Sequence, residues 1–200
     1  MIRRPRSVAL VLGLCALLGS LAGCGNLPAG PGASGDPVTE SDETPERRRA
    51  RIRLELAVGY FEEGRTPIAL DEIKQVLAND PSYAPAYNLR GLIYMRLADL
   101  RQAEDSFRRA LSLDGRDGDT LHNYGWLMCQ QARYPEALQT FERALANPTY
   151  GGRAKTFMAQ GLCQARAGRN GDAERSLARS YELDAANPVT GYNLARLLFL

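Results

Sequence analysis

Few side chains in this sequence combine the residue type and the spacing that chemistry needs. The 200 residues include one histidine, His122, and four cysteines. His122 has no carboxylate or cysteine partner at metal-ligand spacing, and the chain has neither a nucleophile elbow nor a glycine-rich phosphate loop. We therefore expect no enzymatic activity, no cofactor and no metal site, with His122 lining a groove or lying at the surface. The cysteines are the reactive residues left to explain.

An export signal precedes the second cysteine. Arg3, Arg4 and Arg6 lead into an apolar run over residues 8–18, and small residues follow, which is the layout of a secretory signal peptide over residues 1–23. The run is too short to span a bilayer comfortably, and a Gly/Pro-rich stretch follows it where a charged stop-transfer flank would stand. We therefore expect a cleaved signal and no retained transmembrane helix.

Cys24 ends the sequence Leu-Ala-Gly-Cys at residues 21–24, which resembles the bacterial lipobox. In a lipobox the cysteine is linked to diacylglycerol and becomes the acylated N-terminus, and more than one acyl chain gives stable membrane attachment. The alternative is an accidental cysteine after an ordinary signal. The next residue is Gly25, and not the aspartate that retains lipoproteins in the inner membrane in enterobacteria-like sorting. The sequence thus predicts lipidation at Cys24 and a lipid-anchored protein on the periplasmic face of the outer membrane.

The composition, with 44% apolar and 24% charged residues, is that of a folded chain. The formal charge of +2 includes the three arginines of the signal, and removing them from 25 basic residues leaves 22, against 23 acidic ones, a net charge of −1. A nearly neutral protein has no electrostatic footprint for nucleic acid. Residues 24–47 are dominated by Pro, Gly, Ser, Asp and Thr, which predicts a flexible linker ahead of a folded domain at 48–200.

A sequence repeat organises that domain. Gly91 and Gly125 stand one period apart, and each is followed by an Ala, a Phe and an Ala at the same offsets. After Pro148 the pattern shifts by two residues and resumes at Gly161. This spacing resembles the tetratricopeptide repeat (TPR), a helix-turn-helix unit of about 34 residues that buries its apolar faces only by stacking. We expect an all-α TPR solenoid, with repeats at about 50–83, 84–117, 118–153 and 154–187 and the first helix of a fifth at 188–200; the alternative is a four-helix bundle.

The last expected helix has no second helix to pair with. Its apolar strip includes Leu194, Leu197, Leu198, Phe199 and Leu200. Natural solenoids cover such an end with a polar capping helix. We therefore expect the intact protein to continue beyond Leu200.

The first helices of successive TPRs line a concave groove, which is the default binding site of such a stack. Its side chains here are an apolar strip with amide and guanidinium donors, which suits an extended or helical peptide better than a small polar substrate. The alternative is that several of these residues only pack between helices. The predicted groove residues are Val58, Phe61, Asn88, Leu92, Met95, His122, Trp126, Cys129, Met158, Leu162 and Arg166.

Two cysteines remain in the folded part, since Cys15 leaves with the signal and Cys24 is lipidated. Cys129 and Cys163 lie on the first helices of adjacent repeats, one repeat period apart. An exported protein meets an oxidising compartment, where such thiols form a disulfide if the geometry permits. The sequence predicts a Cys129–Cys163 disulfide; two buried free thiols are the alternative.

Four segments carry a closer resemblance: Leu-His-Asn-Tyr-Gly-Trp-Leu-Met-Cys-Gln-Gln at 121–131, Tyr-Pro-Glu-Ala-Leu at 134–138, Ala-Asn-Pro-Thr-Tyr at 146–150 and Gly-Leu-Cys at 161–163. Together they resemble the PilW/PilF family of type IV pilus biogenesis lipoproteins. The resemblance implies a pilotin, whose partner is the outer-membrane secretin of the pilus and which assists secretin localisation and multimerisation. It implies protein binding and a membrane anchor, with no nucleic acid and no small-molecule substrate.

Two other functions remain open at this point. One is a TPR scaffold lipoprotein of another envelope machine, for cell-wall synthesis or outer-membrane protein assembly. The other is a periplasmic hydrolase on a helical scaffold, for which no acid/base or nucleophile constellation is present.

Overall fold

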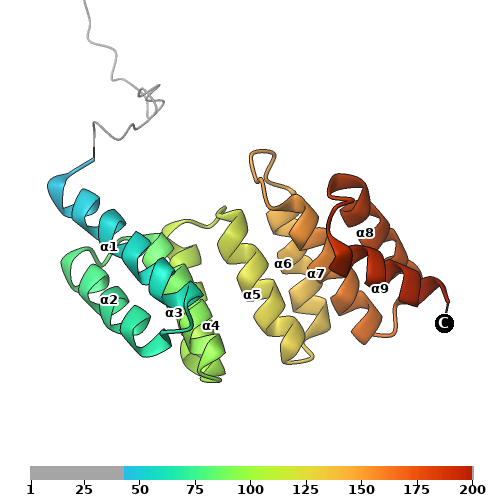
Figure 1. The fold of residues 1–200 in the computed structure, drawn as a ribbon, viewed down its shortest axis with the longest axis horizontal. Coiled ribbons are helices and arrows are strands. Elements are labelled where there is room, and N and C mark those ends of the chain that lie inside the picture. Colours follow the sequence, from blue (N-terminus) through green and yellow to red (C-terminus); the bar gives the residue numbers. More distant parts are fainter. Residues whose placement is uncertain (1–42, 200) are drawn as a thin grey trace, which may run out of the picture. The chain divides into compact units, whose positions relative to one another are not determined.

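The structure is a computed structural model that describes residues 43–199, so the predicted signal peptide, Cys24, most of the linker and Leu200 lie outside the described residues. Within that range the chain forms nine α-helices and no strand (Figure 1). No helix of this range is long and apolar enough to cross a membrane. The helices are α1 (Pro45–Glu62), α2 (Thr66–Asn79), α3 (Ala84–Arg96), α4 (Leu100–Leu113), α5 (Gly118–Gln130), α6 (Tyr134–Leu145), α7 (Arg153–Arg166), α8 (Asn170–Leu183) and α9 (Pro188–Leu198).

Consecutive helices form antiparallel pairs, which confirms the predicted TPR architecture. The pairs α1–α2, α3–α4, α5–α6 and α7–α8 are four repeats, and α9 is the first helix of a fifth. We call α1, α3, α5, α7 and α9 the A helices, and their partners the B helices. Each A helix from α3 to α7 also packs against the A helix before it.

Helix α1 begins at Pro45, ahead of the expected domain start at residue 48. The Thr44 side chain accepts a hydrogen bond from the Arg47 backbone N–H (3.2 Å), and Pro45 and Glu46 occupy the first turn. A capping threonine, a proline at the first helical position and an early glutamate all favour a helix start. The average composition of residues 24–47 predicts a linker throughout. The capping signal at Thr44 and Pro45 involves only a few residues, so it does not alter that average.

Every A helix from α1 to α7 ends in a tight turn with one residue in the left-handed backbone region. These residues are Gly64 (φ 76°), Ala98 (φ 61°), Ala132 (φ 58°) and Gly168 (φ 75°). Glycine adopts this conformation without strain, whereas alanine suffers a contact between its Cβ and the backbone. The first and last repeats therefore turn on glycine, and the two middle repeats turn on a strained alanine.

The recurring glycines mark where the two helices of a repeat cross. A Cβ added at Gly125 would lie 2.8 Å from the ring of Phe141, and one added at Gly161 would lie 2.8 Å from Leu177. Gly91 meets the Phe107 ring even more closely. Each glycine therefore leaves the space that a large apolar side chain of the B helix fills, at the same sequence offset in the second, third and fourth repeats. This contact is the physical basis of the repeat pattern.

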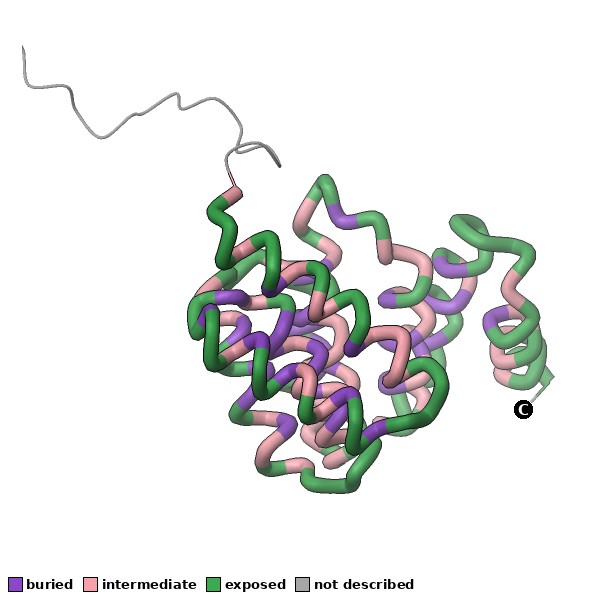
Figure 2. Tube along the Cα trace, turned by 60° about the vertical axis from the view of Figure 1, so that its left-hand side comes forward, coloured by how far each residue is buried: buried purple, intermediate pink, exposed green. Residues whose placement is uncertain are grey.

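The core is shared between neighbouring repeats. One apolar cluster joins α1, α2 and α3 around Ala57, Ile73 and Ile93, and another joins α5, α6 and α7 around Phe141. Buried residues recur along the packed helices in Figure 2, whereas most of α9 is exposed. No repeat hides its apolar surface alone, as expected of a solenoid.

Candidate partner-binding face

The predicted groove residues lie on the A helices, where the repeat pattern predicts them. Val58 and Phe61 of α1 pack partly against the first apolar cluster. Leu92 and Met95 of α3 are partly buried against Phe107 and its neighbours. These four side chains are partly exposed, so they contribute both to packing and to the surface. We call the surface formed by the predicted groove residues of the A helices the A-helix face.

The amides on this face bind each other. The Asn123 side-chain amide on α5 donates a hydrogen bond to the Asn88 carbonyl oxygen on α3 (3.0 Å). The pair links two repeats and leaves fewer amide groups to meet a partner. Asn88 was predicted from its helix position, whereas its pairing with Asn123 depends on how two repeats stack.

Two arginines lie over aromatic rings between successive A helices. The Arg96 guanidinium of α3 lies 3.6 Å from the ring centroid of Phe61, and that of Arg166 on α7 lies 4.9 Å from the Trp126 ring of α5. Arg96 also donates a hydrogen bond to the Phe61 backbone carbonyl. Stacking holds an arginine in place while N–H groups at its edges can still bind an anion. Sequence reasoning missed Arg96, although it stands five residues after Gly91, as Arg166 does after Gly161.

His122 is partly buried, as most of the predicted groove residues are, and its side chain contacts the next repeat. Its Nδ1 lies 2.9 Å from the hydroxyl of the buried Thr156 on α7, and its ring lies 6.1 Å from that of Phe141. Burial, aided by the positive charge of Lys155, lowers the pKa of His122 to about 4. His122 is therefore neutral at neutral pH and joins α5 to α7. Within residues 43–199 no group of histidine, cysteine and acidic side chains has the arrangement of a metal site.

Tyr150 fills the joint where the repeat pattern shifts. Its hydroxyl lies 2.9 Å from that of Thr156, and its ring occupies the space where a side chain at Gly118 would stand. It is buried with Leu121 and Ala144 between α5 and α6. The sequence revealed the two-residue shift after Pro148, but the role of Tyr150 as its filler emerged only from the structure.

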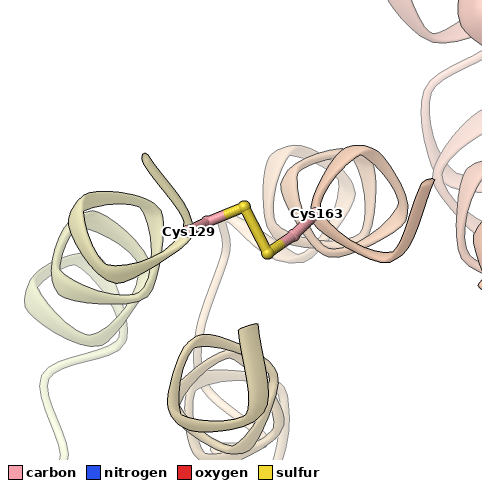
Figure 3. The surroundings of a disulfide bond; sticks show 2 residues. All are labelled: Cys129 and Cys163. Atoms are coloured by element: carbon pink, nitrogen blue, oxygen red, sulfur yellow. A yellow bond between two sulfur atoms is a disulfide. The ribbon is translucent and has the colours of Figure 1, made fainter. Parts of the chain in front are cut away.

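The cysteine pair lies at the same joint. Cys129 on α5 and Cys163 on α7 are joined by a disulfide in the structure, with Cα atoms 5.8 Å apart (Figure 3). That separation is within the usual range for disulfides. Both residues are buried in the apolar cluster around Phe141. The bond connects the A helices of the third and fourth repeats.

The chain is similar in sequence and in structure to known proteins. The Tetratricopeptide repeat family matches residues 82–149 and, with a second model, residues 125–188. The type IV pilus assembly protein PilF of Pseudomonas aeruginosa is 28% identical over 168 residues, covering 81% of this chain and 67% of PilF. The crystal structure of PilW, a widely conserved type IV pilus biogenesis factor, superposes with a TM-score of 0.72 at 32% identity, covering 75% of this chain and 69% of that one. The chain belongs to the PilF/PilW family.

The solved structure of Pseudomonas aeruginosa PilF agrees, with a TM-score of 0.75 at 26% identity over 78% of this chain and 70% of that one. The predicted family is thereby confirmed. In this PilF/PilW protein the A-helix face is an apolar strip edged by stacked guanidinium groups. Such a surface suits recognition of a polypeptide.

Proposed function

We propose that this protein is a pilotin: a lipoprotein anchored through Cys24 at the periplasmic face of the outer membrane, which binds the secretin of the type IV pilus. Through the A-helix face it promotes localisation and multimerisation of the secretin. The observation that carries the proposal is membership of the PilF/PilW family, together with a stacked series of A helices whose side chains stay partly exposed.

The anchor and the TPR stack have complementary tasks in this proposal. Acyl chains at Cys24 confine the protein to the membrane where the secretin ring forms, which raises the effective concentration of the binding face. The helix stack presents that face as a preformed surface, so binding orders few additional residues. Captured secretin subunits then meet one another at high local concentration.

The proposal is tested by blotting for heat- and detergent-resistant secretin multimers in a strain that lacks this gene. The strain is complemented with the wild type, with Cys24→Ala, or with Cys15→Ala as a matched cysteine control in the signal. We expect multimers with the wild type and the control, and a loss without the gene or without Cys24. Normal multimers in the deletion strain would show that the A-helix face serves another partner.

We also propose that Cys129 and Cys163 are oxidised in the exported protein. A disulfide between the third and fourth repeats fixes the position of α7 against α5, and thereby the relation of Trp126 to Arg166. Titration of free thiols in the unfolded, unreduced protein should find neither cysteine reactive. Two reactive thiols would show that the pair serves as small core residues instead.

A further inference from the structure

A surface pocket opens where α7, α8 and α9 meet. Its volume is about 430 Å³, within the range of ligand pockets in proteins. It lies at the end of the stack, where α9 packs on α8. The residues of α9 are mostly exposed. Its lining residues are Leu162, Ala165, Arg166, Asn170, Leu177, Asn193, Arg196 and Leu197.

The pocket walls combine apolar and positive groups. Leu162, Leu177 and Leu197 provide the apolar surface, and Arg166 and Arg196 provide two exposed guanidinium groups. None of the described residues that line the pocket is acidic. The walls are therefore complementary to a ligand that carries negative charge beside an apolar group.

These two arginines differ from their neighbours around α8. Arg169 and Arg179 form ion pairs with Asp172 (2.5 Å) and Glu182 (2.7 Å). Arg166 and Arg196 form no ion pair within residues 43–199. The positive charge of the pocket is thus not neutralised by the described part of the chain.

Trp126 holds one of these charges in position. The Arg166 guanidinium lies 4.9 Å from the centroid of its ring, so the arginine is stacked while its N–H edges remain free. A planar guanidinium binds a carboxylate through two parallel hydrogen bonds, which gives direction as well as charge. The stack also brings the single tryptophan of the chain next to the pocket.

From these observations we propose that the pocket binds an acidic segment of the partner protein, with a carboxylate on Arg166 and Arg196 and an adjacent large apolar side chain on the three leucines. The proposal rests on the proposed function, in which the partner is the secretin, and names the chemistry of the segment that is recognised. It extends the binding surface from α1, α3, α5 and α7 to Arg196 and Leu197 on α9, the last A helix.

Trp126 fluorescence tests the pocket directly. The full-length lipoprotein in non-ionic detergent is titrated with the acetylated, amidated peptide Leu-Glu-Leu-Asp-Leu and with its neutral counterpart Leu-Gln-Leu-Asn-Leu. We expect a saturable change with the acidic peptide, at least about tenfold weaker binding of the neutral one, and weaker binding of the acidic peptide at high salt, as for charge-assisted contacts. Equal binding of both peptides, or no response to either, would overturn the proposal.

Variants connect the peptide response to the residues. Arg196→Gln removes a charge without touching the Trp126 stack and should weaken acidic-peptide binding by about tenfold, given the strength of charge-assisted hydrogen bonds. Arg179→Gln, on α8 but outside the pocket, is the matched control and should bind as the wild type does. Equal affinities of the two variants, with unchanged circular dichroism, would contradict the assignment.

The secretin blot separates this proposal from the proposed function. If wild-type protein restores multimers and the double variant Arg166→Gln/Arg196→Gln restores them equally well, the partner does not use the pocket, and the inference fails while the pilotin function stands. A selective loss of multimers in the double variant supports the inference. If even the wild type has no effect on multimers, the pilotin function fails, and with it the proposal that the pocket recognises the secretin.

Discussion

Different contacts hold successive A helices together at two joints of the stack, the joint between α1 and α3 and the joint between α5 and α7. In the first, Ala57, Ile73 and Ile93 are completely buried, and Arg96 on α3 stacks on Phe61 of α1 and donates a hydrogen bond to its carbonyl. The second adds a disulfide and a chain of polar contacts from His122 through Thr156 to Tyr150. Both joints bring successive A helices into contact.

The difference follows the repeat length. Gly125 and Gly161 stand two residues further apart in the sequence than Gly91 and Gly125 do, because the segment after Pro148 is longer. In the second, third and fourth repeats alike, a glycine opposite a large apolar side chain sets the spacing of the two helices of the repeat. At the longer segment between α6 and α7, Tyr150 fills the additional space, and a disulfide joins α5 to α7. The irregular junction thus has a disulfide between repeats, which the α1–α3 junction, without a cysteine, lacks.

The largest effect should come from the contact of a glycine with a buried phenylalanine, which the second and third repeats share. Phe107→Ala and Phe141→Ala each remove a fully buried ring beside a glycine, and each should lower the free energy of unfolding by about 3–5 kcal/mol in urea titrations. Phe199→Ala, at a site that is 90% exposed, should change it little. A small loss at Phe141 alone would mean that the disulfide junction does not depend on the regular core.

Reduction of the disulfide should affect only one of the two joints. Opening a loop of about 35 residues should lower the free energy of unfolding by roughly 3–4 kcal/mol on the chain-entropy model. Hydrogen exchange should accelerate in α5 to α8 and stay unchanged in α1 and α2. Faster exchange across the whole stack would show that the joints are not independent.

His122 should give the irregular joint a pH dependence. Its pKa is about 4 in the folded chain and near 6.5 when unfolded, so the unfolded state binds a proton first as the pH falls. The part of the free energy of unfolding that depends on neutral His122 is therefore fully present above about pH 6.5, and it falls by about 3 kcal/mol as the pH approaches 4. His122→Gln does not titrate, so urea unfolding at pH 7.5 and 4.5 should show a smaller difference for the variant. The same difference in both proteins would place the pH dependence on the carboxylates.

The smallest effect concerns the turns of the middle repeats. Ala132→Gly relieves a left-handed alanine and should raise the free energy of unfolding by about 0.5 kcal/mol, after the entropy cost of glycine is subtracted. Ala78→Gly, exposed within helix α2, is the control and should lower it by about 0.5–1 kcal/mol. Destabilisation by Ala132→Gly, measured by thermal unfolding, would mean that the turn is unstrained.

Periodicity was enough to predict the fold, because the spacing of Gly125 and Phe141 directly encodes a helix crossing. The same spacing placed the groove residues on the A helices. It did not reveal that Asn88 would pair with Asn123 or that His122 would be packed against Thr156, since both contacts join helices of different repeats. The left-handed backbone of Ala98 and Ala132 could not be predicted from the sequence either, because alanine carries no turn signal comparable to that of glycine.

In the proposed function, the A-helix face binds the pilus secretin. A photoreactive amino acid placed at Met95, on that face, and at Glu174, exposed on α8, tests it by crosslinking in living cells. We predict a crosslinked product that contains secretin from position 95 and none from position 174. Products only from position 174, or from neither position while both variants restore secretin multimers, would contradict the claim.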